Sequence, residues 1–472
     1  MKDAWMKVYN RLPPSGRSAA ASLRGMYLRS WRYGRRTDAL IEAALERESW
    51  SPEQWKRHQE EQLAFVLHRA ATRVPYYRHQ WATRRRLGYR ASWEQLENWP
   101  VLSKEILRAN GQAFVADDCN PRRMFHERTS GTTGKPLDLW RRSETVETLY
   151  AISELRERRW NGVSVSERWA MLGGQLVVPV ESGRPPFWVW NQALHQLYMS
   201  TFHLSPAFIP YYLDALQRYR IKYLWGYPSS LCVLAQEAIR LGRTPLPMAV
   251  AIANAEPVSE HQRQAISQAF GCPVRETYGL AEMVAAGSEC AGGRLHQWPE
   301  IGVAEILMDA ADAPAAPGES GRLIGTSLLS TEMPLIRYEV GDRASVSVDH
   351  EACECGRALP ALQRIEGRMN DLVLTPDGRR VYWLNPVFYG IPIHESQIIQ
   401  EVIDRLRVLV VPAPGFGADT TRSIVERLQA RVGNVQVHVE TVSSIPRTAG
   451  GKFRAVISSL SLERPVENVH AR

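Results

Sequence analysis

The stretch ERTSGTTGKPLDLWRR (Glu127–Arg142) places a loop rich in hydroxyl groups and glycine between two ordinary polar segments. In the loop Thr129–Lys135, glycines permit a tight turn whose backbone N–H groups can hold phosphate oxygens, while hydroxyls and a lysine add donors and charge. It is not a Walker A loop, because only two residues separate Gly131 from Gly134 and Pro136 follows the lysine. The stretch therefore predicts a phosphate-binding loop of another class, with a polar hairpin turn as the alternative for the loop taken alone.

Further motifs follow this loop in the chain. They are AEP (255–257), ETYGLAEM (276–283), RYEVGD (337–342), EGRMND (366–371) and PRTAGGKFR (446–454). In order and spacing the set resembles the adenylate-forming superfamily of acyl-CoA synthetases, adenylation domains and luciferases. It is most similar to the phenylacetate–CoA ligase-like branch, and within it to the CapK-type proteins associated with capsular polysaccharide genes. VPYYRHQW (74–81), CECGR (353–357), TPDGRRVY (375–382) and ESQIIQE (395–401) carry that likeness.

The resemblance implies a role for each matching residue. The loop residues would wrap the β- and γ-phosphates of ATP; they are Thr129, Ser130, Gly131, Thr132, Thr133, Gly134 and Lys135. Others would complete the nucleotide site: Ala255, Glu256 and Pro257 beside the adenine, Tyr278 on its face with Thr277 and Gly279 around it, Asp342 on the ribose, and Arg368 at the joint between domains. Glu282 would help to hold Mg²⁺, and Lys452 would reach the substrate carboxylate and the α-phosphate.

Two positions depart from the family pattern. Ala281 stands where the family usually has Ser or Thr, whose hydroxyl touches the AMP phosphate. The missing hydrogen bond would weaken adenylate binding by ~1.5–3 kcal/mol, unless Thr277 or a water replaces it. The hinge motif usually carries two acids but here reads Asn370–Asp371, which makes Asn370 the expected hinge.

Helical periodicity and short apolar runs alternate along the chain and predict an α/β fold. Ser51, Pro52 and Gln54 form a capping signature before an apolar stripe that ends at Pro75; the stripe is Leu63, Phe65, Val66, Leu67 and Ala70. Further helices are expected at 143–160, 206–220 and 259–270, and strands at 169–172, 223–225, 249–253, 274–276, 302–308 and 321–326, with 311–321 as a turn. LRVLVVP, a helix at 420–432 and VQVHVETV predict a β-α-β unit near the C-terminus.

The expected architecture is a large N-terminal adenylation domain with several subdomains (1–367), which binds ATP and the acid, and a small mobile α+β lid domain (368–472), which carries the lysine. A chain of 472 residues, 44% of them hydrophobic, is long enough for such globular domains.

Cysteine and histidine residues predict a second kind of site. Cys290, His296, Cys353 and Cys355 are the right number and type of ligand for a tetrahedral structural zinc ion. The C-x-C spacing is tighter than the usual C-x₂₋₄-C, and the alternative is four unrelated residues. His195 and His203 lie eight residues apart and would line an acyl pocket or, as the simpler alternative, pack in the fold.

Charge and hydropathy limit the partners. No apolar stretch approaches the length of a membrane span, and the N-terminus has no secretory core, so a cytoplasmic location is expected. Residues 1–90 hold 19 Lys and Arg against 8 Asp and Glu. This basic segment is a solvated helical surface or a contact for a membrane surface or another partner, and no nucleic-acid-binding pattern surrounds it. The likeness leaves a homodimer open.

The function implied is activation of a carboxylic acid by MgATP to an acyl-adenylate with release of pyrophosphate, followed by transfer to coenzyme A with release of AMP. Transfer to an amine or hydroxyl acceptor in surface polysaccharide or natural-product biosynthesis is the rival. A non-catalytic nucleotide-binding protein on the same fold is the third hypothesis, and Ala281 is the feature that favours it.

Overall fold

The computed structural model describes residues 8–129, 137–243, 245–309, 312–347, 353–368, 372–376, 380–381, 384–388, 390–448 and 453–460. Contacts between residues divide the chain into two compact units, Met1–Glu366 with Thr448–Lys452 and Gly367–Arg447 with Phe453–Arg472. The assignment of separate functions to residues 1–367 and 368–472 stays a prediction.

The α-helices are α2 (Pro14–Arg32), α3 (Thr37–Arg47), α4 (Pro52–Arg73), α5 (Pro75–Arg86), α6 (Lys104–Ala109), α7 (Ser143–Ser153), α8 (Ile209–Arg218), α9 (Pro228–Arg240), α10 (Glu260–Phe270) and α11 (Ala418–Val432). A π-helical turn, η4 (Glu154–Arg158), continues α7. Short 3₁₀ turns are η1 (Leu96–Asn98), η2 (Gly111–Phe114), η3 (Pro121–Arg123), η5 (Arg159–Asn161), η6 (Gln192–Leu194), η7 (Thr201–His203) and η8 (Asn385–Phe388).

The strands are β1 (Phe125–Arg128), β2 (Asp138–Arg141), β3 (Trp169–Gly173), β4 (Trp188–Asn191), β5 (Gln196–Ser200), β6 (Tyr223–Gly226), β7 (Ala251–Ala253), β8 (Val274–Gly279), β9 (Ala286–Glu289), β10 (Leu295–Gln297), β11 (Gly302–Leu307), β12 (Ser320–Ser327), β13 (Tyr338–Val346), β14 (Ala361–Arg368), β15 (Val373–Leu374), β16 (Arg380–Val381), β17 (Ile393–Val402), β18 (Arg405–Pro412), β19 (Gln436–Thr441) and β20 (Val456–Ser458). The α/β fold class is confirmed.

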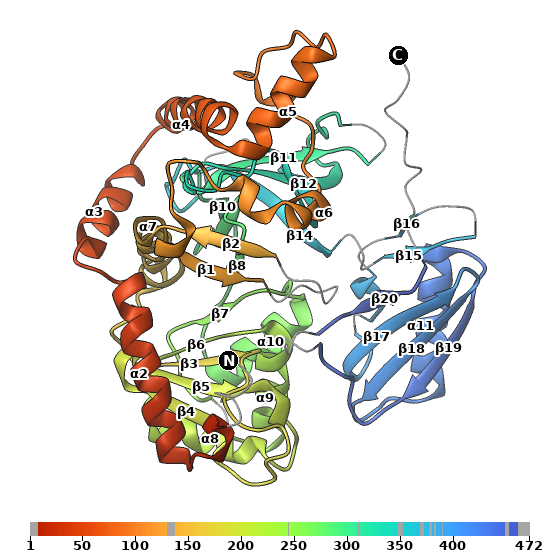
Figure 1. The fold of residues 1–472 in the computed structure, drawn as a ribbon. Helices are drawn as coiled ribbons and strands as arrows, with labels where there is room; N and C mark the ends of the chain where they lie inside the picture. Colours follow the sequence, from red (N-terminus) through yellow and green to blue (C-terminus); the bar gives the residue numbers. More distant parts are fainter. Residues whose placement is uncertain are drawn as a thin grey trace. The chain divides into compact units, whose positions relative to one another are not determined.

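The larger unit is built on one sheet of 12 strands in the order β11-β12-β13-β14-β10-β9-β8-β7-β6-β3-β5-β4. From β8 through β7, β6 and β3 to β5 neighbouring strands are parallel. These short strands are largely apolar because helices α8, α9 and α10 share a buried core with them (Figure 1). The carboxyl ends of parallel strands lie at one edge of a sheet, which is where binding residues are expected.

The other half of the sheet is antiparallel where its pairing is resolved, and it packs with helices α4 and α5 around a second core. Ser51 and Gln54 form the predicted capping box at the start of α4. The predicted apolar stripe is wrong at Phe65, whose side chain is 53% exposed, because α4 covers the sheet with a narrower face than the hydrophobic residues suggested.

Helix α2 covers the edge strand β4. The hydroxyl of Ser18 accepts a hydrogen bond from the Trp190 N–H at 3.2 Å, and the Ser22 hydroxyl accepts one from the Gln192 N–H at 3.0 Å. These serines satisfy backbone donors that would otherwise leave the sheet edge open to another chain. No helix among the described residues is both long and apolar enough to cross a membrane.

The smaller unit is a sheet in the order β19-β18-β17-β20, packed against α11 around a separate apolar core. Strands β18 and β19 are parallel and α11 connects them, which confirms the predicted β-α-β unit. The buried Gln400 side chain accepts from the Leu374 N–H at 2.8 Å and donates to the Leu374 carbonyl at 2.7 Å, so it joins the β15–β16 hairpin to the sheet.

Candidate functional site

Glu282 lies just beyond strand β8, in a buried position. Its Oε1 atom accepts a hydrogen bond from the hydroxyl of Tyr338 on β13 at 3.0 Å. The ammonium group of Lys104, on α6, lies 3.7 Å from the same oxygen. Two separate elements, β13 and α6, therefore hold this carboxylate, as a residue with a fixed chemical task requires.

Tyr278 and Asp342 lie close together although their strands, β8 and β13, are not neighbours in the sheet order. The Tyr278 hydroxyl, on β8, donates to Oδ2 of Asp342, on β13, at 2.7 Å. Asp342 is 5% exposed. Two residues predicted to contact adenine and ribose are therefore neighbours, although 64 positions separate them in the chain.

Arg141 is a residue of this region that the sequence did not reveal. Its wholly buried guanidinium donates from Nη2 to the backbone carbonyls of Ala281 and Glu282 at 3.2 and 3.0 Å. Burial lowers the pKa of Arg141, opposed by the carboxylates of Glu332, Glu127 and Glu282. Burial likewise raises the pKa of Glu127, and the positive charge of Arg141 opposes this rise. Arg141 thus fixes the backbone that presents Glu282.

Residues 254–257 follow the carboxyl end of strand β7, at the sheet edge toward which its parallel neighbour β8 also runs. Ala255 has a positive φ of 64°, and the Asn254 N–H donates to the Gly226 carbonyl at 3.1 Å. The Glu256 carboxylate accepts from the Ser229 N–H at the start of α9 at 3.2 Å, where the helix dipole favours an anion. Pro257 follows directly, so the AEP segment is fixed beside the strand ends.

Thr277 does not present its proton to the site. Its hydroxyl donates to the Ala253 carbonyl at 3.1 Å and ties β8 to β7. The threonine therefore does not replace as a donor the hydroxyl that Ala281 lacks. Gly279 ends strand β8, and space for a side chain there is open.

Strands β1 and β2 flank the predicted phosphate loop in the sequence, and they pair antiparallel from Phe125–Arg141 to Arg128–Asp138. Thr129 closes its base: its N–H donates to the Leu137 carbonyl and its hydroxyl accepts from the Leu137 N–H, both at 3.0 Å. Several predicted residues lie outside the described part of the chain: Ser130, Gly131, Thr132, Thr133, Gly134, Lys135, Asn370 and Lys452. Arg368 ends β14, and its side chain lies outside the described part as well.

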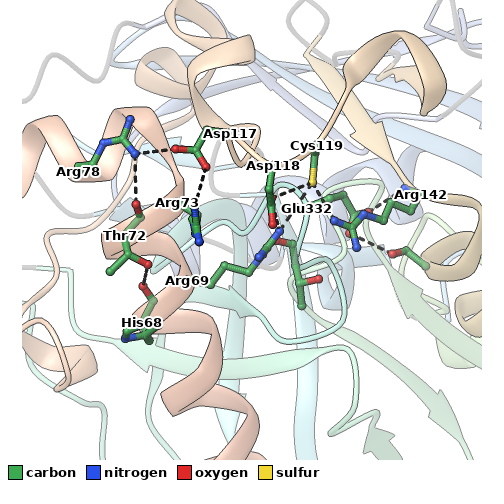
Figure 2. Close-up of polar contacts among 12 residues, drawn as sticks. His68, Arg69, Thr72, Arg73, Arg78, Asp117, Asp118, Cys119, Arg142 and Glu332 are labelled. Atoms are coloured by element: carbon green, nitrogen blue, oxygen red, sulfur yellow. Dashed lines mark hydrogen bonds and ion pairs between the residues drawn. The ribbon is translucent and has the colours of Figure 1, made fainter.

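A polar cluster anchors the end of this hairpin (Figure 2). Glu332 accepts from the Arg142 N–H and from the Thr145 hydroxyl, each at 3.0 Å, and so caps the start of α7 with a carboxylate from a distant segment. The Arg142 side chain also reaches Cys119 Sγ at 2.9 Å. The neighbouring Asp118 pairs with Arg69 on α4 at 2.6 Å. These contacts hold the backbone in place where the hairpin ends and α7 begins.

Cys290, His296, Cys353 and Cys355 form a second candidate site, since their potential ligand atoms all lie within 4.8 Å of one another. Cys290 Sγ is 3.6 Å from Cys353 Sγ, and Cys355 Sγ is 3.3 Å from Nε2 of His296. Nδ1 of His296 lies 3.2 Å from the Leu359 carbonyl. Burial lowers the pKa of His296 and raises that of Cys353 to about 11. The structure thus brings together all four predicted ligands.

The two histidines considered for an acyl pocket have other surroundings. His203 is buried, with Nδ1 2.8 Å from the Ser200 hydroxyl and its ring stacked on Phe187. His195 lies in a turn with a positive φ of 49°. His203 is therefore a packed residue, as the simpler hypothesis had it.

The chain is similar to several known proteins. Residues 373–459 match the family model of the CapK C-terminal domain. Protein CapK of Staphylococcus aureus is 27% identical over 79% of this chain and 82% of its own length. The phenylacetate–coenzyme A ligase of Pseudomonas putida is 24% identical over 88% of both chains. The phenylacetate–coenzyme A ligase of Thermus thermophilus is 27% identical over 51% of this chain and 61% of its own.

Among solved structures, 2-hydroxyisobutyryl-CoA ligase in the postadenylation state superposes with a TM-score of 0.67 at 21% identity, covering 95% of this chain and 94% of that one. This likeness extends over both units of the chain, and it shows a shared fold. The chain is homologous to CapK and to phenylacetate–coenzyme A ligases, and it has the fold of an adenylate-forming ligase.

Proposed function

We propose that this chain is an AMP-forming ligase that activates a carboxylic acid with ATP and passes the acyl group to coenzyme A. The observation that carries the proposal is the convergence of Glu282, Tyr278 and Asp342, through side-chain contacts between the end of β8 and β13. These residues match the motifs that the resemblance assigns to metal, adenine and ribose. Relatives named as coenzyme A ligases supply the second half of the proposal.

In the first step, a carboxylate oxygen of the acid bonds to the α-phosphorus of ATP, and the bond from that phosphorus to the bridging oxygen breaks. Pyrophosphate leaves with the electron pair, and the acyl-adenylate remains. Asp342 holds the ribose, since an ionised carboxylate accepts hydrogen bonds from both hydroxyls. Lys452 and the phosphate loop neutralise the two anions that the step brings together.

Glu282 suits Mg²⁺, because a buried carboxylate oxygen is a ligand that this hard cation prefers. When bound, the ion would offset charge on the ATP phosphates. Within the chain, Lys104 and Tyr338 hold the carboxylate in place, and Arg141 holds its backbone. These contacts orient the group before ATP arrives.

In the second step, the coenzyme A thiolate attacks the acyl carbon, and AMP leaves with the oxygen that bridged it to the acyl group. The rival acceptor is an amine or hydroxyl, whose nitrogen or oxygen attacks the acyl carbon in the same way and loses a proton as AMP leaves. The match of residues 373–459 to a CapK C-terminal domain favours keeping this rival, since the second domain would receive the acceptor. A non-catalytic nucleotide-binding role is the outcome if no acid is activated.

The test is ATP–pyrophosphate exchange with the full chain across a panel of aromatic, aliphatic, hydroxy and amino acids. We expect exchange that depends on one class of acid and falls ~100-fold in Glu282→Gln, the loss typical of removing one preorganised charge. Glu61→Gln, an exposed acid on α4, is the control and should keep full exchange. ATP binding with no exchange for any acid would contradict adenylation and favour the non-catalytic role.

Adding free coenzyme A, once the acid is known, distinguishes coenzyme A from an amine or hydroxyl as the acceptor. Stoichiometric AMP and an acyl thioester, detected by mass, support coenzyme A. An enzyme that forms the adenylate and releases no thioester contradicts it and favours an amine or hydroxyl. The cytoplasmic location, a membrane-surface contact through residues 1–90 and a homodimer stay predictions.

A further inference from the structure

We propose that Cys290, His296, Cys353 and Cys355 hold one structural zinc ion, and that this ion fixes the turn through which Arg357 anchors the end of helix α3. The proposal is independent of the adenylation chemistry, because none of these residues belongs to the nucleotide site. It rests on the spacing of the four ligand atoms and on the ion pairs around Arg357.

The spacing suits a single tetrahedral ion. With Zn–S bonds of about 2.3 Å and Zn–N bonds of about 2.0 Å, sulfurs on one ion stand about 3.8 Å apart, and a sulfur and a nitrogen about 3.5 Å apart. The distances in the structure are close to these values, with 3.6 Å between the sulfurs of Cys290 and Cys353 and 3.3 Å between Cys355 Sγ and His296 Nε2. A disulfide would require about 2.05 Å between two sulfurs.

The second ring nitrogen of His296 is already engaged. Nδ1 faces the Leu359 carbonyl at 3.2 Å, and this contact orients Nε2 toward the cysteines. Zinc-binding histidines commonly use a carbonyl in this way. Since four protein ligands complete a tetrahedron, no position remains for a substrate or a water, and the ion would be structural.

The turn that carries two of the ligands has no regular secondary structure from Cys353 to Pro360. A backbone bond from the Gly356 N–H to the Cys353 carbonyl closes it at 2.8 Å. Gly356 has a φ of 77°, a conformation that glycine allows. The cysteines would fix one end of this turn through the metal, and Arg357 fixes the other.

Arg357 pairs with Glu48 at the end of α3 and lies over the ring of Trp160 at 4.2 Å. Glu48 also accepts from Nε of the wholly buried Arg156 at 2.9 Å. Arg156 in turn holds Glu300 with two bonds of 2.8 and 3.0 Å. Withdrawing Arg357 would leave Glu48 with Arg156, a cation that Glu300 shares, so displacement of Arg357 should loosen the end of α3.

The first measurement is the metal content of the full chain, purified without chelator, by mass spectrometry. We expect about one zinc per chain, and at least a tenfold loss in Cys353→Ser. Cys119→Ser is the matched control, since Cys119 lies outside the cluster, and it should keep its zinc. A folded wild-type chain with less than a tenth of an equivalent of zinc, or with iron instead, would overturn the site.

Cobalt substitution of the wild-type chain keeps the test valid if the cysteine variant does not fold. Tetrahedral cobalt with thiolate ligands absorbs strongly in the visible range. Weak absorption typical of an octahedral ion would count against the proposal.

The second arm is hydrogen exchange of residues 37–50. Zinc removal and Arg357→Gln should each raise exchange there several-fold, while Arg357→Gln should retain its zinc. Unchanged exchange in both samples would overturn the link to α3 and leave the metal site intact.

Discussion

Arg141 places a full positive charge where no water reaches it. The guanidinium holds two backbone carbonyls beside Glu282 and faces the carboxylates of Glu127 and Glu332. Replacing it in Arg141→Met leaves those carbonyls without this donor and removes the buried cation that the carboxylates face. We therefore expect the free energy of unfolding to fall by about 3 kcal/mol.

Urea unfolding at neutral pH measures this change. Arg122→Met, in an exposed position on η3, is the matched control and should stay within about 0.5 kcal/mol of the wild type. If Arg141→Met lowers the free energy of unfolding by less than about 1 kcal/mol, the buried carboxylates do not depend on Arg141, and the prediction is wrong.

At this scale the sequence predicted the residues that belong to motifs and missed those that support them. Tyr278, Asp342 and Glu282 were found because each stands in a recognisable string. Arg141 stands in the run WRR, which reads as surface charge. Its burial depends on carbonyls 140 and 141 positions away, and no local pattern encodes such a partner.

At the scale of elements, the π-helical turn η4 is unusual because all five of its side chains are buried, four of them charged. Burial raises the pKa of Glu157 to about 7 from an ordinary 4.5. Between these pH values the folded chain binds a proton that the unfolded chain has released. This proton binding stabilises the folded chain. Its contribution to the free energy of unfolding is fully present below about pH 4.5 and is lost as pH rises to about 7.

Glu157→Gln removes this titration. Relative to the wild type, the variant should gain stability as pH rises from about 5 to 8, by about 2 kcal/mol at the upper end. Urea unfolding at several pH values checks the difference, with Glu61→Gln as the exposed control. A difference that does not change with pH would contradict the raised pKa.

Elements were predictable where a local signal existed. Ser51 with Gln54 and Ser259 with Gln262 form capping boxes, and helices begin there as the chemistry of the caps requires. The sequence did not predict that the helix expected at 143–160 becomes a π-turn after Ser153. That change places charged residues inside the unit, and it depends on partners such as Glu48 and Tyr223 from other elements.

For the whole molecule, the fold class followed from alternating helices and strands, but the order of the large sheet did not. Strand β10 pairs with β14, and His296 faces Ala361 in that register. Pairing over such a separation reflects the packing of complete layers, which short sequence windows do not contain. The same pairing brings Cys290 and His296 near Cys353, so the candidate metal ligands were predicted by residue type and united by topology.

The function of the whole chain requires residues from distant parts of the sequence, and this gives the last prediction. Asp342 is expected to hold the ribose of ATP, whereas Lys452 is expected to act on the reacting groups. Asp342→Asn should therefore weaken ATP binding about tenfold, because a charge-assisted hydrogen bond is worth ~1.5–3 kcal/mol and the amide keeps part of it. Lys452→Ala should bind ATP nearly as well as the wild type, yet lose acid-dependent exchange by ~100-fold or more.

Calorimetric titration with ATP and exchange kinetics on the same preparations separate the two effects. Equal losses of binding and exchange in both variants would contradict the division of roles, and normal exchange in Lys452→Ala would show that another cation performs the first step.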